Sequence, residues 1–227
     1  MFLWGFTMLN QKAECSLRRI IVVLFILSAI ALSVAVAKGQ STDPFASYRA
    51  VCQINMDMGQ GSGTLISRRD DGWGLVLTCR HVARRVGNRV SCNFIWAREQ
   101  VSEGIVVAVQ DDGRGDFNSD LALVAIRLSP VGVKPCRVIT FNQKDGPWVG
   151  VGFRGGYMRI TPPTNAATEQ PDGSIVFHTP LVRGMSGGSL FNRRGEIVGV
   201  TVGSDLVSRS VAADGLWLRV MLHRFMR

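Results

Sequence analysis

Three residues whose types cooperate in hydrolytic chemistry each lie at the edge of an apolar segment. His81 comes just after the run "LVLTC", Asp120 opens "DLALVAI", and Ser186 lies within "LVRGMSGGSLF" at residues 181–191. A serine hydroxyl needs a base to take its proton, imidazole titrates near neutral pH, and a carboxylate on the far ring nitrogen fixes the imidazole tautomer. Each residue alone fits an ordinary strand end or turn. Together, in the order His, Asp, Ser, they predict a catalytic triad.

The glycines around Ser186 indicate a second catalytic element. The tetrahedral intermediate of acyl transfer carries an oxyanion, which is best stabilised by backbone N–H groups that converge on one point. Gly184 permits the unusual dihedral angles that convergence requires, whereas Gly187 and Gly188 permit a close approach of neighbouring backbone. We therefore predict that the backbone N–H groups of Gly184 and Ser186 form an oxyanion hole.

The residues leave two alternatives open. The stretch "GMSGG" also fits the G-x-S-x-G nucleophile elbow of α/β-hydrolases. That fold needs the order Ser, Asp, His, for which Ser186, Asp205 or Asp214, and His223 are available. Only 41 residues follow Ser186 and the strands do not alternate with helices, so this fold is disfavoured. Asp116 is a second candidate for the acid of the triad.

Short strands separated by turns account for most of the sequence after residue 48. Asp71-Gly72 marks a hairpin between "GSGTLIS" and "GLVLT", and further strand-like runs are "RVSCNFIW", "EGIVVAVQ", "DLALVAIRL", "WVGVGF", "YMRI", "SIVFHT", "GSLFN" and "EIVGVTVG". Their even spacing predicts an all-β fold. Helical periodicity is limited to a short turn at His81 and to the C-terminal "DGLWLRVMLHRFMR", for which Asp214 is the predicted N-cap.

Four blocks of the sequence resemble the successive blocks of a trypsin-like (chymotrypsin-fold) serine protease: "GSGTLIS", "LTCRHVA", "DLALVAI" and "GMSGGSLFN…GEIVGVTVG". The Deg/HtrA-type protease domain of bacteria is the most similar type, here expected without a PDZ domain. The resemblance covers residues 48–227 and implies two packed six-stranded antiparallel β-barrels followed by a C-terminal α-helix. It places His81, Asp120 and Ser186 at the catalytic positions.

The resemblance implies a serine endopeptidase that cleaves protein or peptide substrates through an acyl-enzyme intermediate, with no cofactor and no metal. The alternative is a catalytically weak or inactive binding module that retains the protease fold. Met185 replaces the aspartate that zymogen-type members pair with a new N-terminus, so activation by that ion pair is not expected.

The same resemblance predicts the substrate-binding residues. The pocket for the residue before the scissile bond, the P1 residue, is expected to be lined by Thr179, Pro180, Leu181, Thr201, Val202 and Gly203. None of these residues is acidic, which disfavours Lys or Arg at P1. A small or aliphatic P1 residue is the expectation.

The N-terminus predicts export. Arg18 and Arg19 precede an apolar run from Ile20 to Ala37, which ends in the pattern Ala-Val-Ala. Residues 1–37 are therefore expected to be a signal peptide or, if uncleaved, an N-terminal membrane anchor. Residues 38–47 are a predicted linker, and 48–227 are the predicted protease domain, divided near residues 129–135. A periplasmic or extracellular location follows.

The net charge and its distribution indicate which kinds of molecule the protein binds. The formal net charge is +9, and residues 38–227 retain +7. The basic residues are scattered as pairs beside turns, without interleaved aromatics, so no nucleic-acid binding is expected, although an anionic surface or substrate is compatible. Cys52, Cys79, Cys92 and Cys136 lie in the exported part. No two of these cysteines are spaced as C-x-x-C, so a structural zinc site is not expected. The sequence leaves two alternatives for them, buried free thiols or two disulfides.

Overall fold

The structure is a computed structural model of the chain, and it describes residues 44–57, 59–95, 101–110, 119–128, 133–204, 208–213 and 215–226. The chain divides into two units, residues 1–42 and 43–227. The predicted signal peptide or anchor lies outside the described residues. Within the described ranges, no helix has both the length and the apolar character that a membrane crossing requires. The predicted linker ends in a short helix, α2 (Pro44–Tyr48).

Thirteen strands form almost all of the regular structure of the described residues. They are β1 (Val51–Met56), β2 (Gly59–Arg68), β3 (Trp73–Thr78), β4 (Arg89–Asn93), β5 (Val101–Val109), β6 (Ala122–Arg127), β7 (Val149–Arg154), β8 (Tyr157–Ile160), β9 (Ala167–Glu169), β10 (Ser174–Phe177), β11 (Ser189–Phe191), β12 (Ile197–Ser204) and β13 (Ser208–Ala212). The helices are α2, α3 (Arg80–Ala83) and α4 (Leu216–Phe225), with a 3-10 turn, η2, at Gln143–Asp145. The all-β prediction is confirmed, although no strand was predicted over β1, β9 or β13.

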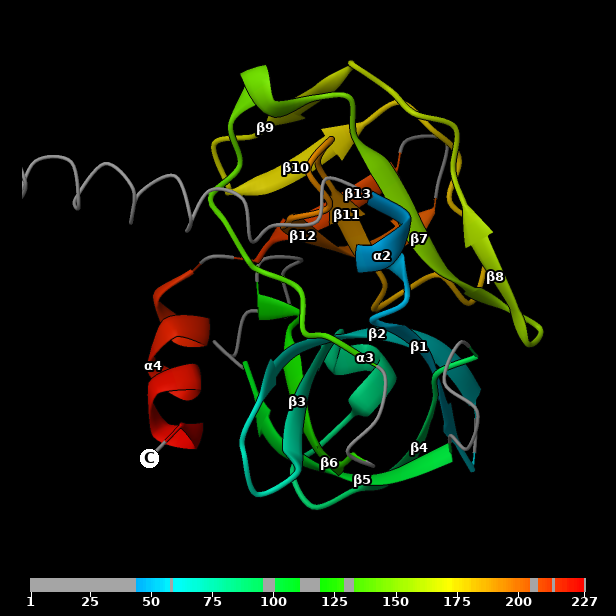
Figure 1. The fold of residues 1–227 in the computed structure, drawn as a ribbon. Helices are drawn as coiled ribbons and strands as arrows, with labels where there is room; N and C mark the ends of the chain where they lie inside the picture. Colours follow the sequence, from blue (N-terminus) through cyan, green and yellow to red (C-terminus); the bar gives the residue numbers. More distant parts are fainter. Residues whose placement is uncertain are drawn as a thin grey trace, which may run out of the picture. The chain divides into compact units, whose positions relative to one another are not determined.

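Strands β1 to β6 close into an antiparallel barrel in the order β1-β2-β3-β6-β5-β4 (Figure 1). The predicted hairpin joins β2 to β3, and Gly72 in its turn has a φ of 88°, which glycine adopts without strain. Strand β6 is buried along its length except at Arg127, and both of its edges pair with neighbouring strands, β3 and β5. Such a strand gives a continuous apolar run in the sequence rather than an alternating one.

Strands β7 to β13 form the second half of the fold. They make one seven-stranded sheet in the order β8-β7-β11-β12-β13-β10-β9. The resemblance implied a second six-stranded barrel, so the strand number differs here, and no pairing of β8 with β9 closes the sheet among the described residues. The connector between the halves carries Cys136, whose backbone N–H donates to Leu65 O of the barrel over 2.9 Å.

Two apolar clusters form the core. The larger one fills the barrel, includes residues of the second sheet such as Phe153, Phe191 and Val200, and continues to α4, where Leu218 is buried. The smaller cluster lies in the second sheet, around Trp148 and Phe177. The predicted C-terminal helix is confirmed, but its N-cap is Gly215, because the helix begins at Leu216.

The cysteines of the described residues are all buried thiols. Cys52, Cys79, Cys92 and Cys136 form no disulfide, so the first of the two alternatives holds in this structure. Burial raises the pKa of the Cys136 thiol to about 12, partly offset by a hydrogen bond to Ser47. A thiol with such a pKa stays protonated at neutral pH and behaves as a small apolar side chain.

Candidate active site

The barrel half places His81 and Asp120 together. His81 lies on α3, a single helical turn that follows β3, and Asp120 lies just before β6, the neighbour of β3. The His81 Nδ1 and Asp120 Oδ2 atoms are 2.6 Å apart, and the His81 backbone N–H donates to Asp120 Oδ1 over 2.8 Å. The carboxylate therefore holds both the ring and the backbone of the histidine.

This pairing sets the chemistry of the imidazole. An ionised carboxylate only accepts hydrogen bonds, so this contact favours the neutral tautomer in which Nδ1 of His81 carries the proton and Nε2 has the lone pair. The Asp120 side chain is 10% exposed, whereas the His81 side chain is 48% exposed. The carboxylate is thus shielded from water while the basic nitrogen remains accessible, which is the arrangement a general base requires.

The second half places Ser186 in a tight turn between β10 and β11. The Met185 N–H donates to Val182 O over 3.0 Å, and the Gly188 N–H donates to Met185 O over 2.9 Å. Thr201 on β12 also stabilises the turn, because its Oγ1 donates to the same Met185 carbonyl over 2.6 Å. The Ser186 hydroxyl donates to Val202 O over 3.1 Å. Four backbone and side-chain bonds therefore fix the position of the serine.

The glycines of the turn are required by packing as well as by dihedral angle. Gly184 and Gly187 have φ of 99° and 85°, in the left-handed region. A Cβ on Gly187 would overlap Ser62 O and Thr78 Oγ1 of the barrel, and one on Gly188 would overlap Val151 O. In the described residues, the N–H groups of Gly184 and Ser186 donate to no protein acceptor. Their role as an oxyanion hole stays a prediction.

Ser62 of the barrel joins the two halves at this turn. Its hydroxyl donates to Gly184 O over 2.8 Å and accepts from the Phe153 N–H over 2.7 Å. Its backbone N–H donates to Ser186 O over 2.8 Å. Ser62 is fully buried, so water does not compete for these bonds. The sequence analysis did not identify Ser62, because its contacts with residues far along the chain leave no local signal.

A pocket of about 590 Å³ brings the predicted residues to one surface. His81, Gly184 and Ser186 line it together with the β1–β2 turn and exposed arginines. Asp120 lies beneath His81, as described above. The structure therefore brings His81 and Ser186 of the predicted triad to a single cleft, with Asp120 bonded to His81 below the surface. Both residues of the predicted oxyanion hole, Gly184 and Ser186, line the same cleft.

The six predicted substrate-binding residues lie beside this cleft rather than in its lining. Thr179, Leu181, Thr201 and Val202 are buried and Pro180 is exposed. Ser208 ties the segment to β13, since its hydroxyl donates to Thr179 O and accepts from the Leu181 N–H. Gly203 is paired with Arg209 on the same neighbouring strand. Their role in substrate binding stays a prediction.

Cys79 lies beside the acid of the pair. Burial raises the pKa of the Cys79 thiol well above its usual value, and the negative charge of Asp120 raises it further. The ligand atoms of Cys79, His81 and Asp120 lie within 4.8 Å of one another, as in a three-ligand metal site. However, Nδ1 and Oδ2 already bond to each other, and the thiol donates to Thr201 O over 3.2 Å. Hydrogen bonds therefore account for the cluster without a metal.

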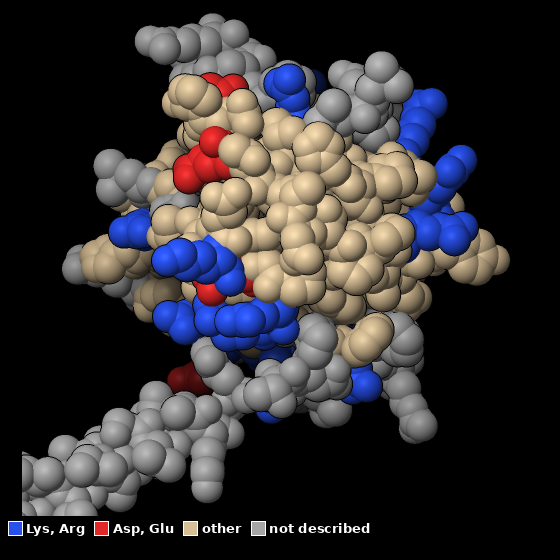
Figure 2. Space-filling view, turned by 90° about the horizontal axis from the view of Figure 1, so that it is seen from above, with Lys and Arg blue, Asp and Glu red and all other residues tan. Residues whose placement is uncertain are grey.

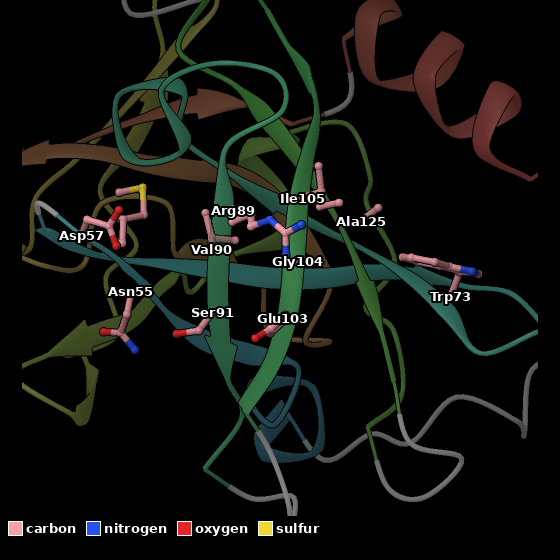
Figure 3. A pocket seen from close by; sticks show the side chains of 11 residues that line it. Asn55, Asp57, Trp73, Arg89, Val90, Ser91, Glu103, Gly104, Ile105 and Ala125 are labelled. Carbon is pink, nitrogen blue, oxygen red and sulfur yellow. The ribbon is translucent and has the colours of Figure 1, made fainter.

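A second pocket, of about 560 Å³, lies on the barrel (Figure 3). It is lined by side chains from several barrel strands, including Trp73, Arg89 and Glu103. Trp73 and Ile105 are partly exposed there, at 36% and 44%. No histidine or cysteine is among the described residues that line this pocket, so it lacks a counterpart of the His81–Asp120 pair.

A closed barrel and a second antiparallel sheet, with a His–Asp pair and a serine in a glycine turn at one cleft, define a peptidase domain of the chymotrypsin fold. The family model for the trypsin-like peptidase domain matches residues 61–200, which is more than half of the chain. The chain therefore belongs to this family. No curated protein matches the sequence at a significant level.

Solved structures show the same fold at low identity. The Rv3671c protease in an inactive form is 22% identical, with a TM-score of 0.56 over 78% of this chain and 90% of that chain. Deg5 is 20% identical, with a TM-score of 0.57 over 78% and 90%. The serine protease of a human pathogenic astrovirus is 15% identical, with a TM-score of 0.55 over 74% and 91%. At these identities the likeness establishes the fold alone.

Proposed function

We propose that the protein is a serine endopeptidase in which Ser186 is the nucleophile, His81 the general base and Asp120 the residue that orients His81. The observation that carries this proposal is the 2.6 Å contact between His81 Nδ1 and Asp120 Oδ2 at the cleft that Ser186 also lines. Membership in the trypsin-like peptidase family supports it. The substrate is a protein or peptide.

The proposed reaction follows from the geometry of the cleft. Ser186 Oγ attacks the scissile carbonyl while Nε2 of His81 takes its proton, and the resulting imidazolium is stabilised by Asp120. The carbonyl oxygen becomes an oxyanion, which the N–H groups of Gly184 and Ser186 stabilise. Imidazolium then gives the proton to the leaving amine, and water hydrolyses the acyl-enzyme by the same steps in reverse.

One observation favours the alternative, a protease-fold binding module with little activity. The hydroxyl of Ser186 has a single proton, and in this structure it is donated to Val202 O. Attack on a substrate requires the hydroxyl to turn from this carbonyl to the imidazole. If that rotation does not occur when substrate binds, the cleft retains binding without efficient hydrolysis.

Labelling with a fluorophosphonate probe separates the two, because the probe reacts only with an activated serine. We expect wild-type protein to be labelled at Ser186, and Ser186→Ala or His81→Ala to abolish labelling. His178→Ala is the matched control, since His178 is exposed on the loop after β10 and lies outside the cleft. Folded wild-type protein that stays unlabelled, while a known serine protease reacts beside it, would establish the binding module instead.

A further inference from the structure

Three arginines line the cleft that holds His81 and Ser186. They are Arg84 after α3, Arg154 at the end of β7, and Arg183 just before the glycine turn. All three side chains are exposed, and no Asp or Glu is among the described residues that line the cleft. The guanidinium groups of Arg154 and Arg183, which form no ion pair among the described residues, create a positive potential at this surface, which attracts anionic groups of a bound peptide.

The arginines share their cleft with His81, the residue that gives its proton to the leaving amine in the proposed reaction. The predicted P1 pocket is formed by residues 179–182 and 201–203, and none of these lines the cleft. The cleft is instead lined by Gly59 and Gln60 of the β1–β2 turn and by Arg154 and Gly155 at the β7–β8 turn. When the P1 side chain enters the predicted pocket and His81 protonates the leaving amine, the residues after the scissile bond lie on the His81 side, over the arginines.

Arg84 has a backbone geometry that is unusual for its type. Its φ is 70°, and it is the one non-glycine residue among the described residues with a positive φ. Residues in this region carry strain, which persists where the surrounding structure enforces it and is often found at functional sites. Arg84 is the residue at which α3, the helical turn that carries His81, ends. Its side chain lines the same cleft as His81.

Some arginines outside this cleft differ from Arg154 and Arg183 because they pair with carboxylates. Figure 2 shows a face that is largely uncharged, with Lys and Arg side chains mainly around its edges and only a few Asp and Glu. Two of these paired arginines are Arg69, which pairs with Asp71 at 2.7 Å, and Arg194, which pairs with Glu196 at 2.8 Å. Arg154 and Arg183 have no such ion pair among the described residues.

We propose that this cleft selects peptides that carry Asp or Glu in the first residues after the scissile bond. This inference rests on the proposed function for the direction in which the substrate lies. Exposed ion pairs contribute modestly and are screened by salt. Several pairs acting together are expected to give about a tenfold preference for an acidic over a neutral leaving-group segment, chiefly at low ionic strength.

The test uses binding, so that it does not depend on turnover. Full-length Ser186→Ala protein is titrated with three fluorescent peptides that share Ala at P1 and differ in the next three residues, which are all Glu, all Gln or all Lys. Fluorescence anisotropy is measured at about 50 mM and 500 mM NaCl, a range over which screening becomes strong. The Glu peptide should bind about tenfold more tightly than the Gln peptide at low salt, and the gap should shrink at high salt.

Charge reversal identifies the residues responsible. Arg154→Glu combined with Arg183→Glu, in the Ser186→Ala background, should remove the preference for Glu and favour the Lys peptide. The matched control is Arg89→Glu with Arg193→Glu, which changes the net charge equally at exposed positions outside this cleft. The control should keep the preference. Circular dichroism and thermal melting confirm that each variant is folded.

The outcomes separate this inference from the proposed function. Equal binding of the Glu and Gln peptides, or an equal loss in the control variant, would overturn the acidic preference whether or not the protein is an enzyme. Fluorophosphonate labelling of wild-type protein decides the enzymatic activity separately. Labelled protein that cleaves neutral and acidic peptides alike would retain the function and reject the preference, and unlabelled protein that binds the Glu peptide would do the reverse.

Discussion

The two halves of the molecule hold their parts of the candidate site in different ways. In the barrel, the carboxylate of Asp120 holds His81 by bonding to both its ring Nδ1 and its backbone N–H. In the second sheet, Ser186 is held by the backbone bonds of its turn and by the absence of side chains at Gly187 and Gly188. The barrel half thus depends on which side chain is present, and the sheet half depends on the path of the backbone.

This difference teaches where each half is vulnerable. A substitution that keeps the shape of Asp120 but alters its hydrogen bonding should impair chemistry and leave the fold intact. A substitution that adds one methyl group to the glycine turn should disturb the fold and the chemistry together, because the turn packs directly against the barrel. The predictions below test this contrast, beginning with the largest effect.

Asp120→Asn should lower kcat on a peptide substrate by about 10⁴-fold, as the equivalent change does in the serine protease from which the triad mechanism is known. An amide in place of the carboxylate favours the wrong tautomer of His81, so Nε2 no longer accepts the serine proton. The unfolding midpoint in urea should change little. Turnover and urea unfolding, measured on the same preparation, check both parts.

The control for this change is Asp116→Asn, at the second candidate for the acid. Asp116 lies outside the described residues, and its substitution should leave kcat within about threefold of wild type, as for a group that does not contact the reacting atoms. If Asp116→Asn instead removes activity while Asp120→Asn retains it, the role of the acid must be reassigned.

Gly187→Ala should reduce the free energy of unfolding by about 3 kcal/mol and abolish fluorophosphonate labelling, because the new Cβ overlaps the barrel at a residue with φ of 85°. Gly173→Ala is the matched control: its φ is 79°, but nothing lies within 4 Å of the added Cβ. The control should cost only about 1 kcal/mol of backbone strain. Equal losses in the two variants would show that dihedral angle, not packing against the barrel, governs the turn.

Glu196→Gln tests a turn of the second sheet that does depend on a side chain. Glu196 is 6% exposed and accepts from Asn192 over 2.9 Å and from Arg194 over 2.8 Å. Burial alone would raise the pKa of this carboxyl, but these hydrogen bonds and the charges of Arg194 and Arg137 outweigh it and lower the pKa below its ordinary 4.5. The substitution should cost about 2 kcal/mol at pH 7.

The sign of this pKa shift fixes the pH dependence. Because the folded pKa lies below the unfolded one, the stabilisation from Glu196 is fully present above pH 4.5 and is lost as the pH falls through the folded pKa. The difference between wild type and Glu196→Gln in urea unfolding should therefore be constant from about pH 6 to 8 and shrink in acid. Glu169→Gln, at an exposed residue of β9, should show no such dependence.

Much of the fold was predictable because its signals are local. A few consecutive residues are enough to predict three of its elements: the glycine turn at Ser186, the hairpin at Asp71-Gly72 and the buried strand after Asp120. Strand β9 was missed because its three residues, Ala-Thr-Glu, are too few to show an alternating pattern. The number of strands in the second sheet was implied by resemblance and not by the residues, and it differs from the seven observed.

The candidate site was predictable in its residue types but not in its surroundings. His81, Asp120 and Ser186 are identified by chemistry that few other residues supply. The role of Ser62 and the grouping of Arg84, Arg154 and Arg183 arise from segments that only the folded chain brings together. A serine in a strand and three scattered arginines look ordinary in the sequence, since long-range contacts leave no periodicity or spacing to detect.

The bonds made by Ser62 have a consequence for engineering the domain. A single hydroxyl from one half fixes a carbonyl and an N–H of the other, at the loop that the proposed oxyanion hole uses. A chimaera that combines this barrel with the second sheet of a relative will therefore need a hydroxyl at the position of Ser62 and a partner loop of the same shape. The two halves are therefore best exchanged together, because their contact at Ser62 helps to shape the proposed catalytic site.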